Sequence, residues 1–355
     1  MASDPLNNLD APQQRGAARR WQTWVGAAIS AFFLFLAFRG QNPQTVWETL
    51  QQVDLWWLLP AIGAFAIGVW LRALRWSVLL EPVQPLTGTE VTPVVLAGYT
   101  ANNILPLRTG EIVRAYLLNG RYGVRKTAAL ATIAIERLLD GLTMLGFLLL
   151  AMRAVSSTPE LRRVATVAAV LFAIVIVLLA VMIRGGTVRE RLLDLCVRPL
   201  PARFEDSARS LFAGFLEGLA TLSRRGDLAK AVVLSIAAWL CEAAVYWFVA
   251  RGFGEPLSGA MTVAGAVLTT GVANLATLVP AAPGYVGTFE AGVMLAVDGA
   301  LHVPREIALS YALLVHAVLW LPVTVVGAWC WWRLAAEGRS SKHVGSQATT
   351  EGRGA

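Results

Sequence analysis

Three charged residues, Glu136, Arg137 and Asp140, lie within a hydrophobic segment that has the composition of a membrane-spanning helix. An ionised side chain at the centre of such a helix costs about 2.5 kcal/mol or more, so it needs a partner or a cavity. Glu136 and Asp140 are one turn apart on one helical face, and Arg137 can pair with Asp140 at a spacing of three residues. One negative charge remains, and we expect Arg108 or Arg114 to compensate it from another segment. Alternatively, these charges only hold one helix against another.

Two apolar segments, Gly98–Arg114 and Ala273–Glu290, are interrupted in the same way. Each carries asparagine, then proline and glycine, and resumes as helix-compatible sequence beside a glutamate. Proline ends a helix, and within a bilayer such a break is tolerated only where the backbone is buried in protein or lines a wet cavity. A pair of such breaks in corresponding places of two halves predicts a transporter's binding site, whereas either break alone could be a kinked span or a loop. The residues of these segments that we expect to bind a lipid headgroup are Asn102, Asn103, Arg108, Gly110, Glu111, Arg114, Asn274, Pro283, Gly284, Gly287, Thr288 and Glu290.

Arg108 has the chemistry of an anion ligand. It precedes the start of a half-helix, where free amides and the helix dipole favour negative charge. Its guanidinium can also bind a phosphate through two hydrogen bonds. Glu111 and Glu290 each stand where a carboxylate can satisfy such amides. We therefore expect a site that suits a headgroup with both a phosphate and an amine.

The composition identifies the class of protein. Of 355 residues, 56% are hydrophobic and 15% are charged, and the mean hydropathy of +0.58 is too high for a soluble domain. The basic residues behind the net charge of +7 lie mostly between apolar segments, so they reflect membrane topology, and we expect no nucleic-acid partner. Three scattered cysteines and three histidines predict no disulfide framework, no metal site and no cofactor.

The apolar segments predict an all-α polytopic membrane protein with about six full spans and two broken, re-entrant helical hairpins. Stretches of about 20 apolar residues can cross the bilayer as helices, whereas the first interrupted segment is too short for two crossings. Arg72 and Arg75, near the end of the second span, complete the intramembrane charge cluster. The expected spans are about Trp21–Phe38, Leu55–Leu80, Ala128–Met152, Val164–Ile183, Leu228–Ala250 and Ile307–Trp332.

Four regions follow from this pattern: a flexible N-terminus (1–20), an integral membrane domain (21–333), a linker within it (184–227) and a disordered tail (334–355). In the linker, Ala202–Ser223 has the spacing of an amphipathic helix, which would lie in the membrane interface or pack against the protein. Lys and Arg gather at both termini, at the first broken segment and in the linker, and the positive-inside rule places these parts in the cytoplasm. The two hairpins would then enter a bacterial-type plasma membrane from opposite faces, as in an inverted repeat.

Several motifs in this order resemble a known family. They are Asn103–Arg114, Glu136–Asp140 and Pro283–Glu290, together with Arg72-x-x-Arg75-Trp76. They resemble the membrane domain of lysylphosphatidylglycerol synthase, the transmembrane part of the bacterial multiple peptide resistance factor, over roughly Leu55–Trp332. The resemblance implies a flippase-like domain that moves aminoacylated phosphatidylglycerol, with relatives in hopanoid or polyprenyl-phosphate pathways. The chain ends in a short polar tail without an acyltransferase-like domain, so we expect no synthase activity.

We expect a lipid translocase (flippase) that moves a phosphate-bearing lipid, either a phospholipid or an aminoacyl-phospholipid, between leaflets. The alternatives are a membrane component of a polyprenyl-phosphate, hopanoid-type or glycolipid pathway, and a non-transporting scaffold. No Asp-x-Asp, nucleophile motif or histidine–carboxylate arrangement is visible in the sequence, so we expect no enzyme. The expected partners are anionic or zwitterionic phospholipids or polyprenyl-phosphate, and a homo-oligomer is compatible with the pattern.

Overall fold

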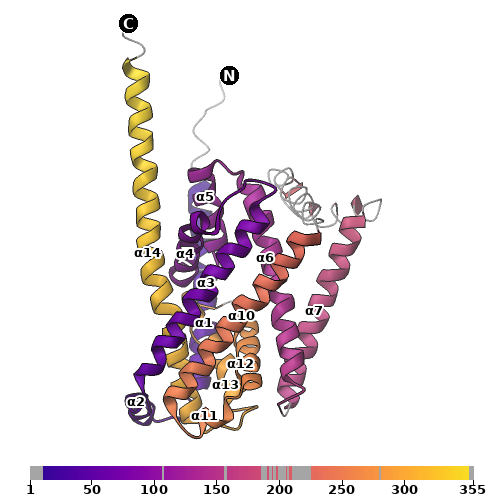
Figure 1. The fold of residues 1–355 in the computed structure, drawn as a ribbon, viewed down its shortest axis with the longest axis vertical. Helices are drawn as coiled ribbons and strands as arrows, with labels where there is room; N and C mark the ends of the chain where they lie inside the picture. The colour runs from indigo at the N-terminus through magenta and orange to yellow at the C-terminus, as the bar shows by residue number, and fades with distance from the viewer. Residues whose placement is uncertain are drawn as a thin grey trace, which may run out of the picture.

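The computed structural model describes residues 11–105, 108–155, 158–184, 225–279 and 281–351, together with a few residues between 190 and 209. Over these residues the chain is helical and contains no strand (Figure 1). Most of the linker 184–227, and most of its amphipathic segment Ala202–Ser223, lies outside the described residues. The elements are α1 (Ala11–Phe38), α2 (Pro43–Gln51), η1 (Leu55–Trp57), α3 (Leu58–Leu80), α4 (Gly88–Ile104), α5 (Gly110–Tyr122), α6 (Lys126–Ala151), α7 (Pro159–Arg184), α10 (Arg225–Phe253), α11 (Leu257–Ala260), α12 (Val263–Ala276), η2 (Pro283–Tyr285), α13 (Thr288–Val297) and α14 (Arg305–Glu351).

Each segment that the sequence predicts as a span is helical in the structure: α1, α3, α6, α7, α10 and α14 cover them. Among the described residues, three helical stretches are long and apolar enough to cross a membrane by length and composition, namely Leu55–Leu80, Gly226–Phe253 and Arg305–Glu337. Gly26–Phe38 and Val263–Ala276 are shorter apolar helices. The chain is therefore an all-α membrane protein.

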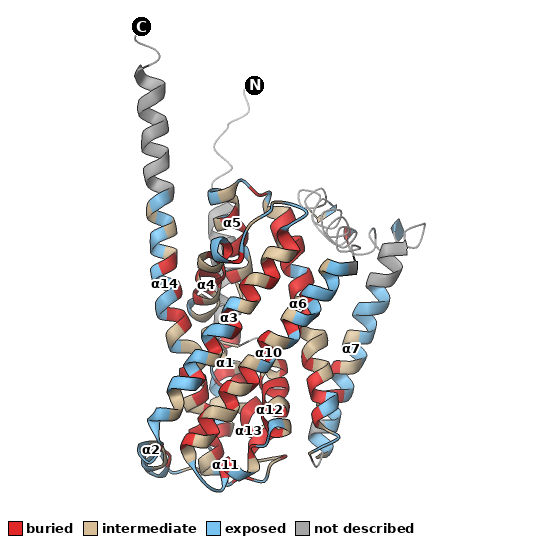
Figure 2. Cartoon of the chain, in the orientation of Figure 1, coloured by how far each residue is buried: buried red, intermediate tan, exposed pale blue. Residues whose placement is uncertain are grey.

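The core forms where α3 and α10 pack against each other along much of their length (Figure 2). Aromatic side chains fill this interface and the adjoining face of α14. The ring of Trp57 stacks on that of Phe248 with centroids 6.2 Å apart, and the hydroxyl of Tyr311 donates a hydrogen bond of 2.7 Å to the carbonyl of Tyr246. α7 lies at the edge, and many of its apolar side chains are exposed, which suits a surface covered by lipid tails.

The two interrupted segments form helical hairpins. In the first, α4 and α5 approach so closely that a Cβ added to Gly110 would collide with the carbonyl oxygen of Gly98. In the second, α12 and α13 pack together and are joined by a turn that includes η2. α4 contacts η2, and α14 packs against both α4 and α13, so the two hairpins meet beside α14. In Figure 1 the first hairpin lies in the upper part of the molecule and the second in the lower part.

Both ends of the chain extend further as helix than the sequence predicts. α1 begins at Ala11, inside the region 1–20 that we expect to be flexible. α14 continues as helix to Glu351, inside the region 334–355 that we expect to be disordered. Propagating a helix adds one backbone hydrogen bond for each residue fixed, so a well-nucleated helix can run on into polar sequence that hydropathy alone would leave unstructured. The remaining residues at each end lie outside the described part.

Candidate functional site

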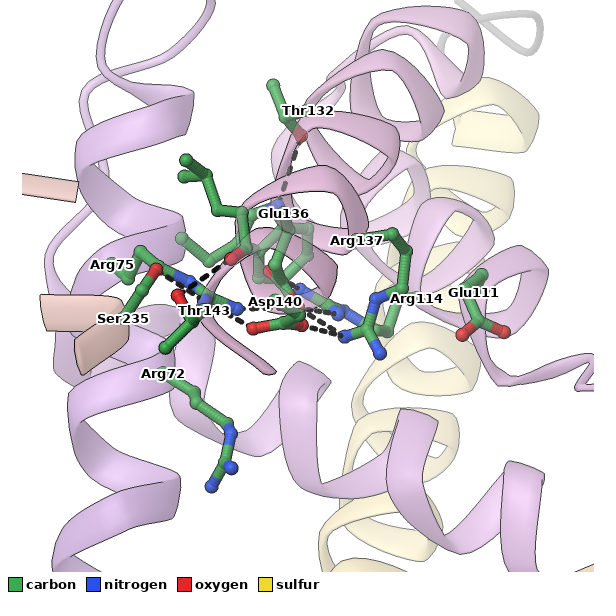
Figure 3. A network of polar contacts seen from close by, with 12 residues as sticks. Arg72, Arg75, Glu111, Arg114, Thr132, Glu136, Arg137, Asp140, Thr143 and Ser235 are labelled. Atoms are coloured by element: carbon green, nitrogen blue, oxygen red, sulfur yellow. Dashed lines mark hydrogen bonds and ion pairs between the residues drawn. The ribbon is translucent and has the colours of Figure 1, made fainter. Parts of the chain in front are cut away.

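Glu136 on α6 is the centre of a buried network of arginines (Figure 3). Arg114 on α5 donates two hydrogen bonds to its carboxylate, from Nη1 to Oε1 at 3.0 Å and from Nη2 to Oε2 at 2.9 Å. Arg137 donates to Oε1 at 2.7 Å, and Nη2 of Arg75 on α3 lies 3.5 Å from the same oxygen. The cation that we expect from another segment is therefore present, and Arg114 supplies it. The Glu136 side chain is 1% exposed, so its negative charge depends on these arginines.

Asp140, one turn further along α6, connects that helix to α3 and α10. Nη1 of Arg75 donates to Oδ1 at 2.6 Å, and the indole Nε1 of Trp239 donates to the same oxygen at 2.9 Å. Nη1 of Arg75 also donates to the hydroxyl of Ser235 at 2.7 Å. Nη2 of Arg137 lies 3.4 Å from Oδ2, which is the pair that the sequence spacing predicts. Asp140 thereby fixes the positions of three helices relative to one another.

Glu242 on α10 is a site residue that the sequence analysis did not assign. Nη2 of Arg72 on α3 donates to its Oε2 at 2.6 Å, and Nδ2 of Asn274 on α12 donates to its Oε1 at 2.8 Å. The Arg72 guanidinium also lies 4.4 Å from the centroid of the Trp239 ring. The sequence contained a signal for Glu242, because it is a carboxylate inside an apolar span and such a group requires a partner. Its two partners are distant in sequence, so only the fold identifies them.

Arg108, in the break of the first hairpin, contacts the second hairpin and not the carboxylates that the other arginines bind. Its Nη2 donates to the carbonyl of Thr277 at 2.5 Å and lies 3.2 Å from the Thr277 hydroxyl, and its guanidinium is 5.0 Å from the centroid of the Tyr285 ring. Over the described residues, no carboxylate lies within ion-pair distance of Arg108. The guanidinium therefore bridges the two hairpins and has no ion-pair partner among the described residues.

The start of α5 is not free to bind an anion at its first amide, contrary to our expectation. The amide of Gly110 donates to Oδ1 of Asn102 at 2.7 Å, so the asparagine of the preceding helix caps the half-helix. Nδ2 of Asn102 in turn lies 3.5 Å from Oε1 of Glu111. Glu111 thus contacts the capping side chain and is not itself the cap. Nearby, Asn103 donates to the hydroxyl of Thr324 on α14 at 2.7 Å.

The turn of the second hairpin is held by residues with left-handed backbone. Gly284 has φ of 74° and Gly287 has φ of 92°, a region that favours glycine. The amide of Gly287 donates to Oε2 of Glu290 at 2.6 Å, so Glu290 caps α13 as a carboxylate at that position can. A Cβ added to Gly287 would lie 2.6 Å from the carbonyl oxygen of Ser30 on α1. Gly287 therefore serves the packing of α13 on α1.

His316 on α14 binds the same turn, which corrects our expectation that no histidine–carboxylate arrangement exists. Its Nδ1 lies 2.6 Å from Oε1 of Glu290, and its Nε2 lies 2.9 Å from the carbonyl oxygen of Gly284. The imidazole also stacks obliquely on Phe289, with ring centroids 4.6 Å apart. The sequence did not reveal this pair because its two residues lie on different helices.

A cavity of about 340 Å³ lies where the two hairpins meet α3, α6, α10 and α14. An adjoining cavity of about 220 Å³ shares part of this lining and continues to Pro283. The charged side chains of the larger cavity are Arg72, Arg108, Arg137, Asp140 and Glu242. Its lining also includes the predicted site residues Asn102, Asn103, Asn274 and Gly284, the side chain of His316, and the aromatic residues Phe65, Tyr99, Phe172, Trp239, Tyr285, Phe289 and Trp320.

The other predicted site residues do not line the larger cavity. Arg75, Arg114 and Glu136 stand behind its wall and position Arg137 and Asp140. The rest belong to the turns and helix starts: Gly110, Glu111, Pro283, Gly287, Thr288 and Glu290. Within the described part of the chain, no group of three or more His, Cys, Asp and Glu side chains is placed to hold a metal ion. The arrangement is chemically suited to hold an anionic group between hairpins.

The sequence is similar to a protein named as a glycosyltransferase and to two proteins named as UPF0104 membrane proteins. It is 25% identical over 335 residues to the glycosyltransferase AglD of Haloferax volcanii, an alignment that covers 87% of this chain and 54% of that protein. The chain thus spans about half the length of that relative. It is 24% identical to a UPF0104 membrane protein of Methanothermobacter thermautotrophicus, covering 76% of this chain and 81% of the relative. It is 23% identical to a UPF0104 membrane protein of Pyrococcus horikoshii, covering 79% and 88% respectively.

The profile of the family described as "Lysylphosphatidylglycerol synthase TM region" matches residues 23–327. This range contains both hairpins, the arginine–carboxylate network and the cavity. The match begins before the residues on which the sequence resemblance depends and includes the part of α1 from residue 23 onward. The chain belongs to the family of the lysylphosphatidylglycerol synthase transmembrane region.

Proposed function

We propose that this protein is a translocase that moves a phosphate-bearing lipid, a phospholipid or an aminoacyl-phospholipid, between the two leaflets of the membrane. One observation carries the proposal: Arg108 lines a cavity between two broken hairpins and has no carboxylate partner over the described residues. A charged group in a membrane protein needs compensation, and a lipid phosphate can provide it. The guanidinium fork matches a phosphate through two hydrogen bonds.

The rest of the lining suits a headgroup that also carries an amine. Arg137, whose side chain is 39% exposed, adds a second cation next to the space beside Arg108. Asp140 and Glu242 offer carboxylate oxygens, and Tyr99 adds an aromatic ring to which an ammonium group can bind. The lining therefore offers charges of both signs that complement an anionic or a zwitterionic headgroup. We propose transport of this group and no chemistry on it.

We further propose that the hairpins are re-entrant and belong to two inverted repeats, with six helices that cross the membrane. Each residue from 61 to 80 of α3 can be matched with the residue 170 positions later, from 231 to 250 of α10. At 19 of these 20 positions the two residues are alike in being buried, half-buried or exposed. Arg72 and Glu242 occupy equivalent positions in this alignment and bind each other. The two helices have matching patterns of burial and contact each other. This supports a pseudo-two-fold axis through the cavity, as expected of transporters built from inverted repeats.

A second candidate is a membrane component of a glycolipid or polyprenyl-phosphate pathway. The similarity to a protein named as a glycosyltransferase favours it, although the chain spans about half of that protein. Both candidates require the cavity to accept a lipid phosphate, so they differ in the lipid and not in the site. In both cases we propose a multi-pass location in a bacterial-type plasma membrane, with both termini in the cytoplasm.

The test is a leaflet-accessibility assay in liposomes that carry a fluorescent lipid in both leaflets. A membrane-impermeant quencher reaches the inner-leaflet lipid only if the reconstituted protein moves it outward. We expect the wild type to make both leaflets accessible. We expect Arg108→Lys, which keeps the charge and loses the fork, to slow the movement roughly tenfold, and Arg108→Ala to slow it roughly a hundredfold.

The matched control is Arg153→Ala, which removes an exposed arginine after α6 and outside the cavity lining. It should move lipid like the wild type. Liposomes that carry a fluorescent aminoacyl-phospholipid, phosphatidylglycerol or polyprenyl-phosphate distinguish the two candidates. If the wild type leaves the inner leaflet protected for each of these lipids, the translocase proposal is wrong and a scaffold role is preferred.

A further inference from the structure

We propose that His316 and Glu290 form a proton-binding site in the wall of the cavity, and that proton occupancy couples lipid movement to a pH gradient. The coupling rests on the proposed translocase function, whereas the proton site itself does not. The pair joins α14 to the turn and first residues of α13, and so it controls how the second hairpin is attached.

The hydrogen-bond partners of His316 require a proton beyond those of a neutral imidazole. The carbonyl oxygen of Gly284, 2.9 Å from Nε2, can only accept, so Nε2 must carry a hydrogen. An ionised Glu290 also only accepts, so Nδ1 at 2.6 Å must carry a hydrogen as well. A neutral imidazole has one N–H, and the described geometry uses two. The pair therefore holds one exchangeable proton.

The proton belongs on the imidazole. In water an imidazole binds a proton about two pKa units more tightly than a glutamate carboxylate does. Oε2 of Glu290 already accepts a hydrogen bond from the amide of Gly287, so both carboxylate oxygens act as acceptors when Nδ1 donates to Oε1. The Glu290 side chain is 3% exposed, and His316 is its ion-pair partner over the described residues. An imidazolium is then the charge that compensates this buried carboxylate.

Other charged and titratable groups face the same cavity, but the described contacts tie most of them to each other. α3 presents Arg72, and α10 presents Glu242 bonded to it. α6 presents Arg137 and Asp140 within the arginine network. Tyr99 from α4, Tyr285 from η2 and Arg108 from the first break complete the titratable and charged lining. α2 and α5 contact α14 elsewhere, at Ser310 and Glu337.

Loss of the proton must break one of the two contacts of His316. Release breaks one N–H bond of the imidazolium, and the proton passes to water in the cavity, which His316 lines. The remaining lone pair, on Nδ1 or Nε2, then faces a carboxylate or a carbonyl oxygen at hydrogen-bond distance, which is repulsive. α14 is thereby detached from the turn at Gly284 or from the start of α13. Protonation restores the attachment, so the position of the second hairpin follows proton occupancy.

The proton site is tested by ¹⁵N NMR of the histidine-labelled full-length protein in lipid nanodiscs. The chain has three histidines, and the signals lost in His316→Gln identify those of His316. At about pH 7, where an unperturbed histidine is mostly neutral, we expect both nitrogens of His316 to carry hydrogen. His302→Gln, at an exposed residue before α14, is the control and should leave these signals unchanged. A neutral His316 at this pH would overturn the assignment of the proton to the imidazole, whether or not lipid moves.

The coupling is tested by the steady-state distribution of a fluorescent phospholipid between leaflets, with the membrane potential held at zero. A translocase without coupling leaves the distribution even, whatever the pH gradient. With one proton per lipid, a gradient of about one pH unit should shift the wild-type ratio by up to about tenfold. The shift should persist in His302→Gln and be absent in His316→Gln and in Glu290→Gln.

The outcomes separate the two proposals. If the wild type moves lipid but its distribution stays even under the gradient, the coupling is wrong and the translocase stands. If the wild type moves no lipid, the proposed function and the coupling both fail, and the NMR result alone decides the proton site. A shift that survives in His316→Gln would place the coupled proton elsewhere and would overturn this assignment.

Discussion

Arg114 binds Glu136 through two hydrogen bonds while its guanidinium lies 3.9 Å from the centroid of the Trp76 ring. The indole Nε1 of Trp76 itself donates to the hydroxyl of Thr132 on α6 at 3.0 Å. The Arg114 guanidinium therefore holds α5 in place through two contacts, an ion pair with the Glu136 carboxylate and a cation–π contact with the Trp76 ring. This attachment positions the break that carries Arg108.

Removal of the Glu136 carboxylate should destabilise the protein strongly. In Glu136→Ala, Arg75, Arg114 and Arg137 lose their shared partner, and breaking a buried pair in this way costs about 3–5 kcal/mol. Thermal unfolding of the purified protein in detergent, followed by circular dichroism, measures the loss. Glu48→Ala, at an exposed carboxylate on α2, is the control and should change stability by less than about 0.5 kcal/mol. Equal melting of Glu136→Ala and the wild type would mean that the network contributes nothing to folding.

Two glycines of α5 should respond in opposite ways to the same substitution. Gly110→Ala forces a Cβ onto the carbonyl oxygen of Gly98, and such overpacking costs about 1–3 kcal/mol. Gly120→Ala meets nothing within 4 Å and lies in a helix, so it should stabilise the protein by up to about 1 kcal/mol. Both changes are read from unfolding curves of the purified protein. The close approach of α4 and α5 is disproved if both substitutions raise stability.

Two helix caps allow a comparison between stability and transport. Asn102 caps α5 beside the cavity, and Asn42 caps α2 through the amide of Gln44, away from it. Replacing either with Ala should cost about 1 kcal/mol, because one helix-start amide loses its acceptor. Only Asn102→Ala should also slow lipid movement, because it loosens the segment that holds Arg108. If the two variants slow movement equally, the effect comes from stability and not from the site.

The orientation in the membrane can be read with single cysteines at the two ends of α3. Gln52 precedes this helix and Thr89 follows it, and both are exposed. In a background without Cys196, Cys241 and Cys330, a cysteine at Gln52 should react with an impermeant thiol reagent on intact cells. A cysteine at Thr89 should react only after the cells are opened, because the positive-inside rule places that end in the cytoplasm. The reverse pattern would invert the topology.

The sequence was sufficient to predict the helices but not the partners of the buried charges. Hydropathy identified each segment that became α3, α6, α10 or α14, and proline and glycine located both hairpins. The rule that a buried charge needs a partner predicted that Arg114 or Arg108 would reach Glu136, and the structure selects Arg114. The rule cannot choose between the two arginines, because that choice depends on how α5 and the break before it are oriented towards α6.

Contacts between distant segments account for most of what the sequence could not reveal. Glu242 was visible as a carboxylate in a span, yet its partner Arg72 is 170 residues away. His316 is one of three histidines that predict no site in the sequence, because its partner Glu290 lies on another helix. Gly287 was expected at the headgroup site, since glycine permits close approach of a ligand, but the group that approaches it is the backbone of Ser30. A glycine indicates that another group comes close to the backbone, but it does not indicate which group.

For a translocase, the unequal number of charges around the cavity has a consequence in a membrane that carries a voltage. Over the described lining, Arg72, Arg108 and Arg137 outnumber Asp140 and Glu242 by one, and the ion pair of protonated His316 with Glu290 adds no net charge. A headgroup with one negative charge leaves the loaded cavity neutral, so its reorientation does no electrical work, whereas the empty cavity carries a charge through the field. For one elementary charge this work is about 2.3 kcal/mol per 100 mV. As long as that pair keeps its proton, a membrane potential would therefore act on the return of the empty protein and leave the loaded step unaffected.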